Sequence, residues 1–314
     1  MIDRLMEVAY WFFYISIELS ILFLGISFLI GIITTYIQPK KVETVLSRFG
    51  KGIFGNALGA LFGGLLPFCS CSTIPALIGL LKVGVPFGIA MSFLIASPIG
   101  VFNIAVISLF YVMFGWKVAA LYIATTFIWA IVAGWALDRL GLRQQLKRVK
   151  VVGDHEDAPV HVPEGATWWE KTKPKLISSW GFTKSLYLQM IPYILIGVGI
   201  GAFVYGFVPE GFLATYAGPS NPFAVPLAAT IGIPMYVRTE TMIPISYVLF
   251  EKGVGLGTLM ALIIGGAGAS IAELTLLASI FKKKLVVAYI ITIFVIATVT
   301  GYLFNFLSMT LLLG

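Results

Sequence analysis

Long apolar stretches, separated by short polar breaks, run along nearly the whole chain. Several exceed the roughly 20 residues that an α-helix needs to cross a bilayer, and they lack the alternation of barrel strands. The pattern therefore predicts an all-α polytopic membrane protein. The stretches cover residues 8–37, 53–66, 73–82, 86–113, 117–137, 183–207, 222–235, 242–251, 255–281 and 285–308.

The last five stretches repeat the order and the approximate lengths of the first five. When the first half is aligned on the second so that Pro75 falls on Pro244, Gly84 falls on Gly253. Few other identities survive, but the breaks and lengths agree across five consecutive segments. This agreement favours an internal repeat, in which each half of the chain forms the same arrangement of helices.

The second and third stretches of each half are too short to cross a membrane. At about 1.5 Å per residue, residues 53–66 cover roughly 21 Å and residues 73–82 roughly 15 Å, against a hydrocarbon core of about 30 Å. We expect re-entrant helical hairpins over residues 53–82 and 222–251. Three full transmembrane helices then remain in each repeat, and because three is odd, the second repeat has inverted topology.

The charge distribution tests this organisation. The predicted domains are a first membrane repeat (residues 1–137), a cytoplasmic linker (138–182) and a second, inverted membrane repeat (183–314). Lysine and arginine are retained on the cytoplasmic side. With both termini outside, seventeen basic residues lie in the cytoplasm, three lie outside and Arg238 lies within the membrane. The alternative, one kinked crossing helix for each hairpin, leaves the charges of the second half unsegregated.

The amino-acid composition agrees with a membrane protein. Hydrophobic residues make up 59% of the chain and charged residues 11%, whereas soluble domains carry about 25% charged residues. The net charge of +7 reports topology rather than nucleic-acid binding, since no basic patch is interleaved with aromatic residues. Residues 8–37 exceed the apolar region of a signal peptide and predict a retained transmembrane helix. We expect a multi-pass membrane protein.

Both cysteines of the chain lie in one tripeptide between two prolines. Proline disfavours helix in the preceding residue, so a helix should end near Leu66 and another should begin near Pro75, with unwound backbone between them. A nearby helix N-terminus favours the thiolate form of Cys69 and Cys71. Two such thiolates suit a soft centre such as Cu(I) or trivalent arsenic. The alternative is ordinary packing of two small side chains.

The tips of the two predicted hairpins should meet near the middle of the membrane. Unwound backbone survives at that depth only where it lines a cavity, and inverted repeats with broken helices form binding sites there. The tips therefore predict a substrate-binding site, in which Cys69 and Cys71 also serve as metal ligands. Its residues are Cys69, Ser70, Cys71, Ser72 and Thr73 from the first tip, and Arg238, Thr239, Glu240 and Thr241 from the second.

Ionisable residues inside predicted membrane segments supply further candidates. A charge in lipid costs about 3 kcal/mol on insertion scales, so such residues usually mark a pathway. We expect Glu240 and Glu273 to carry protons, while Glu18 and Asn103 line the pathway. The alignment of the two halves brings Asn103 next to the position of Glu273. The alternative is a buried structural ion pair, with Arg238 partly neutralising Glu240.

Residues 67–75 (Pro-Phe-Cys-Ser-Cys-Ser-Thr-Ile-Pro), 84–98 and 232–273 resemble the ArsP-type predicted-permease family. The resemblance extends over both halves of the chain. It implies a multi-pass inner-membrane permease that exports trivalent organoarsenicals, with Cys69 and Cys71 as the matching thiols. Some members of the family are associated with copper or zinc efflux.

Together these observations predict a secondary-active efflux permease that exchanges a thiol-reactive species, chiefly a trivalent arsenical, for protons. We expect no enzymatic activity, no cofactor and no nucleic-acid partner; the partners are a small-molecule or metalloid substrate and membrane lipid, and a homo-oligomer stays open. No nucleotide-binding P-loop motif occurs. The alternatives are soft-metal efflux, a passive channel, and a thiol oxidoreductase. The oxidoreductase is disfavoured, because one intervening residue strains a disulfide between Cys69 and Cys71.

Overall fold

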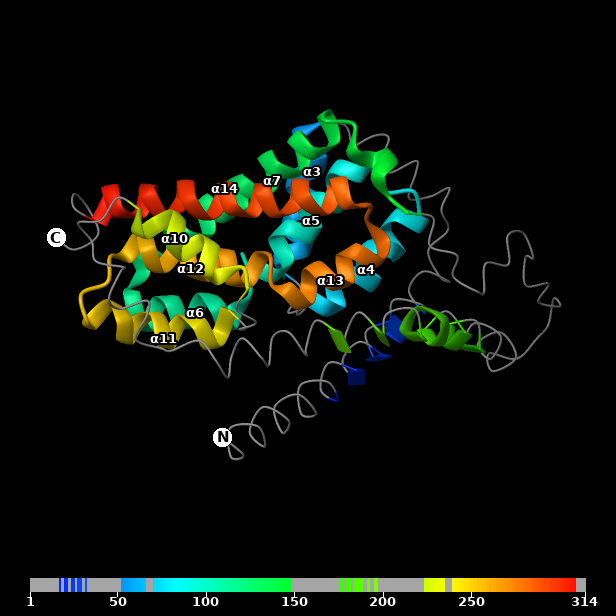
Figure 1. Cartoon of the computed structure of the whole chain (residues 1–314), viewed down its shortest axis with the longest axis horizontal. Coiled ribbons are helices and arrows are strands. Elements are labelled where there is room, and N and C mark those ends of the chain that lie inside the picture. Colours follow the sequence, from blue (N-terminus) through cyan, green and yellow to red (C-terminus); the bar gives the residue numbers. More distant parts are fainter. Residues whose placement is uncertain are drawn as a thin grey trace, which may run out of the picture.

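The computed structural model describes residues 52–65, 70–147, 223–234 and 239–308, with shorter stretches within 17–32 and 176–196. In this part of the chain every named element is a helix, as predicted, and one isolated antiparallel bridge joins Leu146 to Phe281. The helices, labelled as in Figure 1, are α3 (Ile53–Leu65), α4 (Ser70–Lys82), α5 (Phe87–Ile99), α6 (Ile104–Phe114), α7 (Trp116–Arg139), the 3₁₀-helix η1 (Leu142–Gln145), α10 (Ala224–Gly232), α11 (Thr239–Glu251), α12 (Leu256–Gly268), α13 (Ile271–Ile280) and α14 (Lys283–Leu307).

The two halves contain helices of matching order and length. Helices α4 and α11 begin and end at residues that correspond in the alignment of the two halves, and so do α5 and α12. The packing also corresponds: α5 packs against α3, α4 and α7, while α12 packs against α10, α11 and α14. Between the halves, α6 packs on α11 and α13 packs on α4.

Both hairpin arms end in the same backbone turn. Gly84 after α4 and Gly253 after α11 have φ angles of 86° and 92°, a region that favours glycine. The following residues fold back identically, since Val85 N donates to Leu80 O at 3.0 Å and Val254 N donates to Leu249 O at 3.1 Å. This is the Schellman arrangement, in which glycine ends a helix and its last carbonyls keep their partners.

Helices α7 and α14 are long and apolar enough to cross a membrane. The expected continuous helices over residues 86–113 and 255–281 are instead broken. Helices α5 and α6 meet at a bend of 47°, and α12 and α13 at a bend of 44°. The sequence pattern did not predict the bend between α5 and α6, where Gly100 ends α5 in the left-handed region and Asn103 caps α6. Counting each bent pair as one span, the described residues hold up to four candidate spans.

The start of α4 also differs from the expectation. Helix α4 was expected to begin near Pro75, but it begins at Ser70 and contains Pro75 within it. Helix α11 likewise contains Pro244. Each proline removes only one hydrogen bond, to the carbonyl four residues earlier in the first turn, and the helix continues past it. Helix α4 therefore includes residues 70–74, which the sequence pattern predicted to be unwound.

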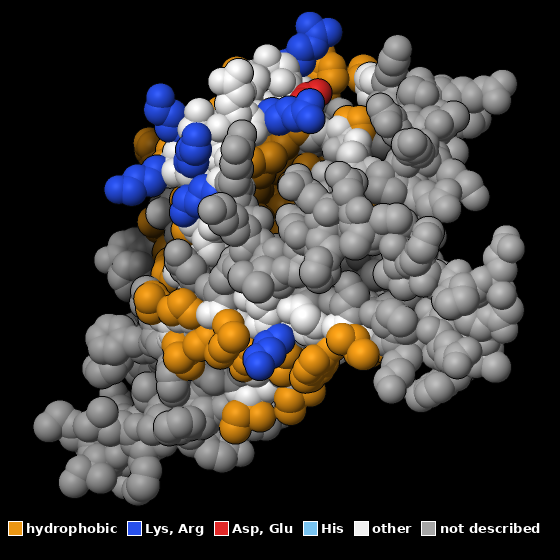
Figure 2. Space-filling view, turned by 90° about the vertical axis from the view of Figure 1, so that its right-hand side faces the viewer, with side chains coloured by type: hydrophobic (Ala, Val, Ile, Leu, Met, Phe, Trp, Pro, Cys, Tyr) orange, Lys and Arg blue, Asp and Glu red, His pale blue; other side chains and the backbone are white. Residues whose placement is uncertain are grey.

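In the described part of the chain, the two ends of the helix bundle differ in charge. Figure 1 shows the C-terminal ends of α4 and α11 at opposite ends of the long axis. Basic residues gather at the end where α4 and α7 finish and α14 begins, and Figure 2 views this end. We name it the basic end; it carries Lys82, Arg139, Arg143, Lys147, Lys282, Lys283 and Lys284, whereas Lys117 and Lys252 lie at the opposite end.

Glycines allow α7 and α14 to pack so closely on α5 and α12 that the backbones are in contact. A Cβ atom on Gly257 of α12 would lie 1.9 Å from the carbonyl oxygen of Gly301 on α14. In the first half, a Cβ atom on Gly134 of α7 would lie 2.6 Å from the carbonyl oxygen of Gly88 on α5. Since real contacts are much longer, a side chain at either crossing would force the helices apart.

We expect Gly257→Ala to lower the free energy of unfolding by about 3 kcal/mol, because the added methyl group meets rigid backbone. The thermal midpoint of the purified protein in detergent measures this effect. Gly181→Ala is the matched control, since no neighbouring atom lies within 4 Å of its added Cβ. Equal midpoints for the two variants would contradict the close crossing of α12 and α14.

Candidate functional site

Polar side chains meet where the start of α11 reaches the break between α5 and α6. Thr239 Oγ1 donates a hydrogen bond to the carbonyl oxygen of Pro98 at 3.0 Å. Asn103 Nδ2 donates to Glu240 Oε1 at 3.2 Å. Helices α6 and α11 lie side by side over the rest of their lengths (Figure 1). The predicted second tip thus contacts the first half of the chain through two hydrogen bonds.

The chain around the break explains the orientation of Asn103. Its side-chain oxygen accepts from Ala105 N at 2.9 Å and so caps α6. Because that oxygen faces the helix, the amide nitrogen is left to face Glu240. Asn103 therefore serves two roles, starting a helix and holding a carboxylate that belongs to the other half.

Two backbone carbonyl groups at the end of α5 accept hydrogen bonds from hydroxyl groups on other helices. Thr239 bonds Pro98 O, and the hydroxyl of Tyr122 on α7 donates to Ile99 O at 2.9 Å. Tyr122 is only 1% exposed. Buried carbonyls without partners are costly, so these two hydroxyls make an interrupted helix tolerable inside an apolar bundle.

A related arrangement surrounds the break in the second half. The Tyr289 hydroxyl, on α14, donates to Gly268 O at 2.7 Å and lies 3.1 Å from Glu273 Oε1. The side chains of Tyr289 and Glu273 are both 0% exposed. Ser270 Oγ caps α13 by accepting from Glu273 N at 3.3 Å. The Tyr122 and Tyr289 hydroxyls thus hold corresponding carbonyl groups at the two breaks.

The Tyr289 hydroxyl has one hydrogen but faces two acceptor positions. If Glu273 is ionised, that hydrogen can serve either the carboxylate or Gly268 O. If Glu273 is protonated, it donates to the tyrosine oxygen, and Tyr289 donates to Gly268 O. The protonated form therefore satisfies the whole chain of three groups. By contrast, Glu240 Oε1 accepts a hydrogen bond from the Asn103 amide nitrogen.

The first tip occupies the position in the first half that the second tip occupies in the second. In the alignment of the two halves, Ser70 and Cys71 correspond to Thr239 and Glu240, and the backbone of residues 70–72 forms the first turn of α4. Thr73 follows and is buried, with its Oγ1 2.9 Å from Ser97 Oγ on α5. Since α4 packs on α13, the first tip and the start of the Glu273 helix belong to neighbouring elements.

Some predicted site residues lie elsewhere or outside the described residues. Cys69, Arg238 and Glu18 fall outside them. Thr241 is exposed on α11, one position beyond Glu240. In the part of the chain that the structure describes, no group of three or more His, Cys, Asp or Glu side chains gathers to hold a metal ion.

Sequence reasoning missed Tyr122 and Tyr289, the two hydroxyls that hold the breaks. It also missed the breaks, although one sequence signal marks the second of them. Ser270 followed three residues later by Glu273 is the capping-box pattern that starts a helix. In the first half, Gly100 followed by Asn103 offers a weaker signal of the same kind.

Long apolar helices, broken spans and short helices that reach the breaks are together typical of helical membrane transport proteins. Comparison with known sequences gives the same class. The chain belongs to the ArsP-type predicted-permease family, which it matches over residues 4–306. The resemblance found in the sequence is therefore confirmed, and it indicates a transporter rather than an enzyme.

Two curated proteins illustrate the relationship. A UPF0718 protein of Methanocaldococcus jannaschii is 22% identical over 351 aligned positions, covering 92% of this chain and 94% of that protein. The UPF0718 protein YcgR of Bacillus subtilis is 26% identical over 296 positions, covering 88% of this chain and 93% of YcgR. No solved structure gives a significant match to the chain.

Proposed function

We propose that this chain is a secondary-active efflux permease of the cell inner membrane, which exports trivalent organoarsenicals in exchange for protons. The observation that carries the proposal is the contact between the start of α11 and the α5–α6 break, made by Thr239 and Glu240. This contact brings ionisable and hydroxyl groups into an apolar bundle, where such groups usually mark a transport pathway. The family assignment supports the same class.

The arrangement of the halves supports two inverted copies with re-entrant hairpins over residues 53–82 and 222–251. Helices α4 and α11 point to opposite ends of the long axis, and their lengths are too short for a full crossing (Figure 1). Basic residues gather at the end where α4 finishes. By the positive-inside rule, that basic end faces the cytoplasm.

Cargo capture falls to Cys69 and Cys71, of which Cys71 lies in the first turn of α4. Thiolate sulfur is a soft ligand and prefers soft centres such as trivalent arsenic. An organoarsenous acid exchanges two As–OH bonds for two As–S bonds and releases two water molecules, and the reverse reaction frees the cargo. The predicted hydroxyl residues Ser70 and Ser72 belong to the same tip, and the hydroxyl groups of Thr73 and Thr239 lie at the two helix starts that face α5.

Proton coupling falls first to Glu273 and second to Glu240. Protonation of Glu273 completes the hydrogen-bond chain through Tyr289 to Gly268 O, so the surroundings accept its neutral form. In the ionised form, Glu273 and Gly268 O share the single hydrogen of the Tyr289 hydroxyl. Protonation of Glu273 thus changes the hydrogen bonding at the break between α12 and α13. Such a carboxyl group can couple proton movement to a rearrangement of the two halves.

Soft-metal efflux is the second candidate, because the Cys-x-Cys pair also suits Cu(I). A passive channel would use the same lining without proton coupling. These alternatives differ in the cargo that moves and in the response to a proton gradient.

Uptake into inverted membrane vesicles tests the proposal, with methylarsenite, arsenite, Cu(I) and Zn(II) supplied separately. We expect methylarsenite to accumulate, and to do so faster when the vesicle lumen is acidified, since protons then leave as cargo enters. Vesicles without the protein and vesicles treated with an uncoupler are the controls. Accumulation of Cu(I) instead would favour metal efflux, and rates that ignore the gradient would favour a channel.

A further inference from the structure

Helices α6 and α11 come from different halves of the chain and lie side by side (Figure 1). Their starts meet at the hydrogen bond between Asn103 and Glu240. Their ends meet as well, since the ring centroids of Phe114 and Phe250 lie 5.8 Å apart. At a rise of about 1.5 Å per residue, these two contacts lie roughly 16 Å apart along α6. The pair therefore extends from the candidate site to the end of the bundle opposite the basic end, which we name the outer end.

Aromatic side chains fill the interface between the ends of α6 and α11. The ring centroid of Phe114 lies 5.5 Å from that of Tyr247 and 5.8 Å from that of Phe250, and both contacts are edge-to-face. Phe110, one turn earlier on α6, lies 6.0 Å from Phe114. We name Phe110, Phe114, Tyr247 and Phe250 the aromatic cluster. Rings in this geometry attract one another, so the cluster holds the two helices together.

The aromatic cluster is joined to the break between α5 and α6 through Tyr122. The ring centroid of Phe110 lies 4.3 Å from that of Tyr122, and the Tyr122 hydroxyl donates to Ile99 O at the end of α5. Ring contacts thus connect the break to the end of α11. A cargo that leaves the candidate site between these two helices has to part α6 from α11.

The corresponding pair of helices at the basic end is built differently. In the alignment of the two halves α4 corresponds to α11, and α13 follows the second break as α6 follows the first. Helix α4 packs on α13, but neither of these helices contains an aromatic residue. Ile78 and Leu81 take the positions that Tyr247 and Phe250 have in the second half.

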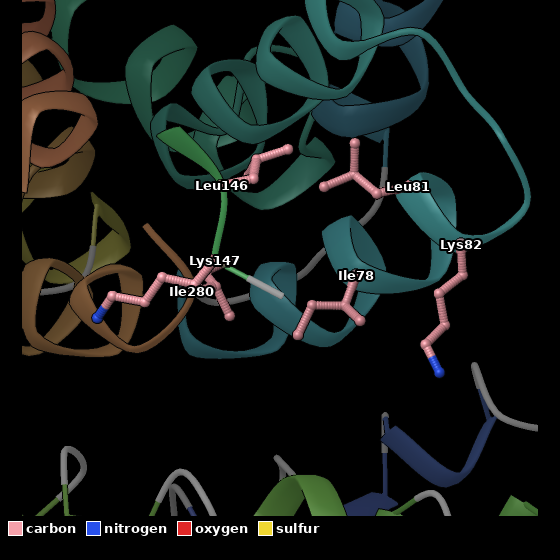
Figure 3. Close-up of a pocket in the computed structure, with 6 residues that line it drawn as sticks. All are labelled: Ile78, Leu81, Lys82, Leu146, Lys147 and Ile280. Carbon is pink, nitrogen blue, oxygen red and sulfur yellow. The ribbon is translucent and has the colours of Figure 1, made fainter. Parts of the chain in front are cut away.

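A pocket of about 190 Å³ lies between α4 and the end of α13. Ile78 and Leu81 line it from α4, and Figure 3 shows them across from Ile280 and Leu146. The counterparts of two aromatic-cluster residues therefore border open space at the basic end. At the outer end, by contrast, the same positions are closed by rings in contact.

We propose that the contact between α6 and α11 is the outer gate of the transport pathway and that the aromatic cluster closes it in this conformation. The proposal rests on the proposed function, because it takes the chain to be a transporter whose basic end faces the cytoplasm. In transporters built from inverted repeats, alternating access moves one repeat against the other around a fixed site. The gate then opens when α11 moves away from α6, and cargo leaves past Phe114.

Thiol labelling tests the closed gate without reference to any cargo. The reporter is Thr239→Cys in the full-length protein with Cys69→Ser and Cys71→Ser, since Thr239 is 5% exposed at the candidate site. A membrane-impermeant maleimide is added outside right-side-out vesicles, and we expect slow labelling. Adding Phe114→Ala should speed it about 25-fold, because Phe114 makes two ring contacts across the gate and each accounts for roughly five-fold in the opening equilibrium.

Matched variants separate gate opening from loosened packing. Phe114→Tyr keeps the ring and should be labelled as slowly as the parent reporter. Leu81→Ala shortens the side chain that corresponds to Phe250 at the basic end, so labelling from outside should not change. Fast labelling with the aromatic cluster intact, or equal rates for Phe114→Ala and Leu81→Ala, would overturn the gate.

A zinc bridge tests whether the gate has to open during transport. Phe114→His/Tyr247→His places two imidazole groups where the ring centroids now lie 5.5 Å apart, and one Zn²⁺ can join them through Zn–N bonds of about 2.0 Å. Zinc should raise the thermal midpoint of this double variant. Zinc enclosed in inverted vesicles should stop its methylarsenite uptake, EDTA enclosed instead should restore uptake, and neither single variant should respond.

The two measurements distinguish failure of the gate from failure of the proposed function. Full uptake by a double variant whose midpoint is raised by zinc would show that α6 and α11 need not separate, and the gate would be wrong. No methylarsenite uptake by the unmodified protein, together with the expected labelling rates, would instead count against the proposed cargo and support the gate.

Discussion

Replacing Cys69 and Cys71 together by serine is expected to reduce methylarsenite uptake to the level of vesicles without the protein. Serine keeps the size of the side chain but replaces a soft sulfur ligand by a hard oxygen, which holds trivalent arsenic weakly. Cys71 lies in the first turn of α4. Replacing its sulfur atom by oxygen should therefore leave the start of the helix intact. The measurement is the initial rate of uptake into inverted vesicles.

The control for this experiment addresses folding and membrane insertion. Ser108→Ala removes a hydroxyl that donates within α6, to Ala105 O at 2.9 Å, and should leave uptake unchanged. Equal amounts and equal elution profiles of the two variants would show that loss of uptake is a loss of cargo binding. Unchanged uptake by the cysteine variant would refute thiol capture.

Replacing Glu273 by glutamine is expected to lower gradient-driven uptake about 100-fold, the order of effect when a group that transfers protons is removed. The glutamine amide can donate to the Tyr289 oxygen, while Tyr289 donates to Gly268 O, so the variant imitates the protonated state. The fold should therefore persist. Exchange of labelled for unlabelled cargo without net proton movement should also persist, and this measurement separates coupling from binding.

The matched substitution is Glu240→Gln in the other half. Its side chain keeps an acceptor oxygen for Asn103 Nδ2, so the contact between α11 and α6 should remain. We expect a smaller loss of gradient response than in Glu273→Gln. If Glu240→Gln lost the response and Glu273→Gln kept it, the proton carrier would be Glu240, and the role given to the Tyr289 chain would be wrong.

Helix positions could be predicted from the sequence where apolar stretches end at glycine, proline or charge. The apolar stretch 117–137 predicted α7 closely at both ends, and the alignment of the two halves anticipated the matched bounds of α4 and α11. The breaks within residues 86–113 and 255–281 could not be predicted from hydropathy, because apolar residues continue through them. They depend on backbone capping, which leaves only small polar residues as a signal.

The candidate site was predictable in part for a similar reason. Thr239, Glu240, Asn103 and Glu273 stand out as polar groups in apolar segments, so composition alone selects them. Their partners cannot be selected in this way. The carbonyl group of Pro98 belongs to the backbone, so no side-chain pattern marks it, and nothing in the sequence distinguishes Tyr289 from the other tyrosines among the 13 of the chain. Only the fold brings such partners together.

Residues 142–147, which we name the strap, have a mechanical consequence for the transport mechanism proposed above. The backbone bonds of the strap at Gln145 and Lys147 anchor the start of the linker, directly after α7, to the turn before α14. Two halves joined at such a point cannot separate there, and any rocking motion must use it as a pivot. Displacements would then grow with distance from the strap, so the widest opening is expected at the far end of the bundle, near Lys117 and Lys252.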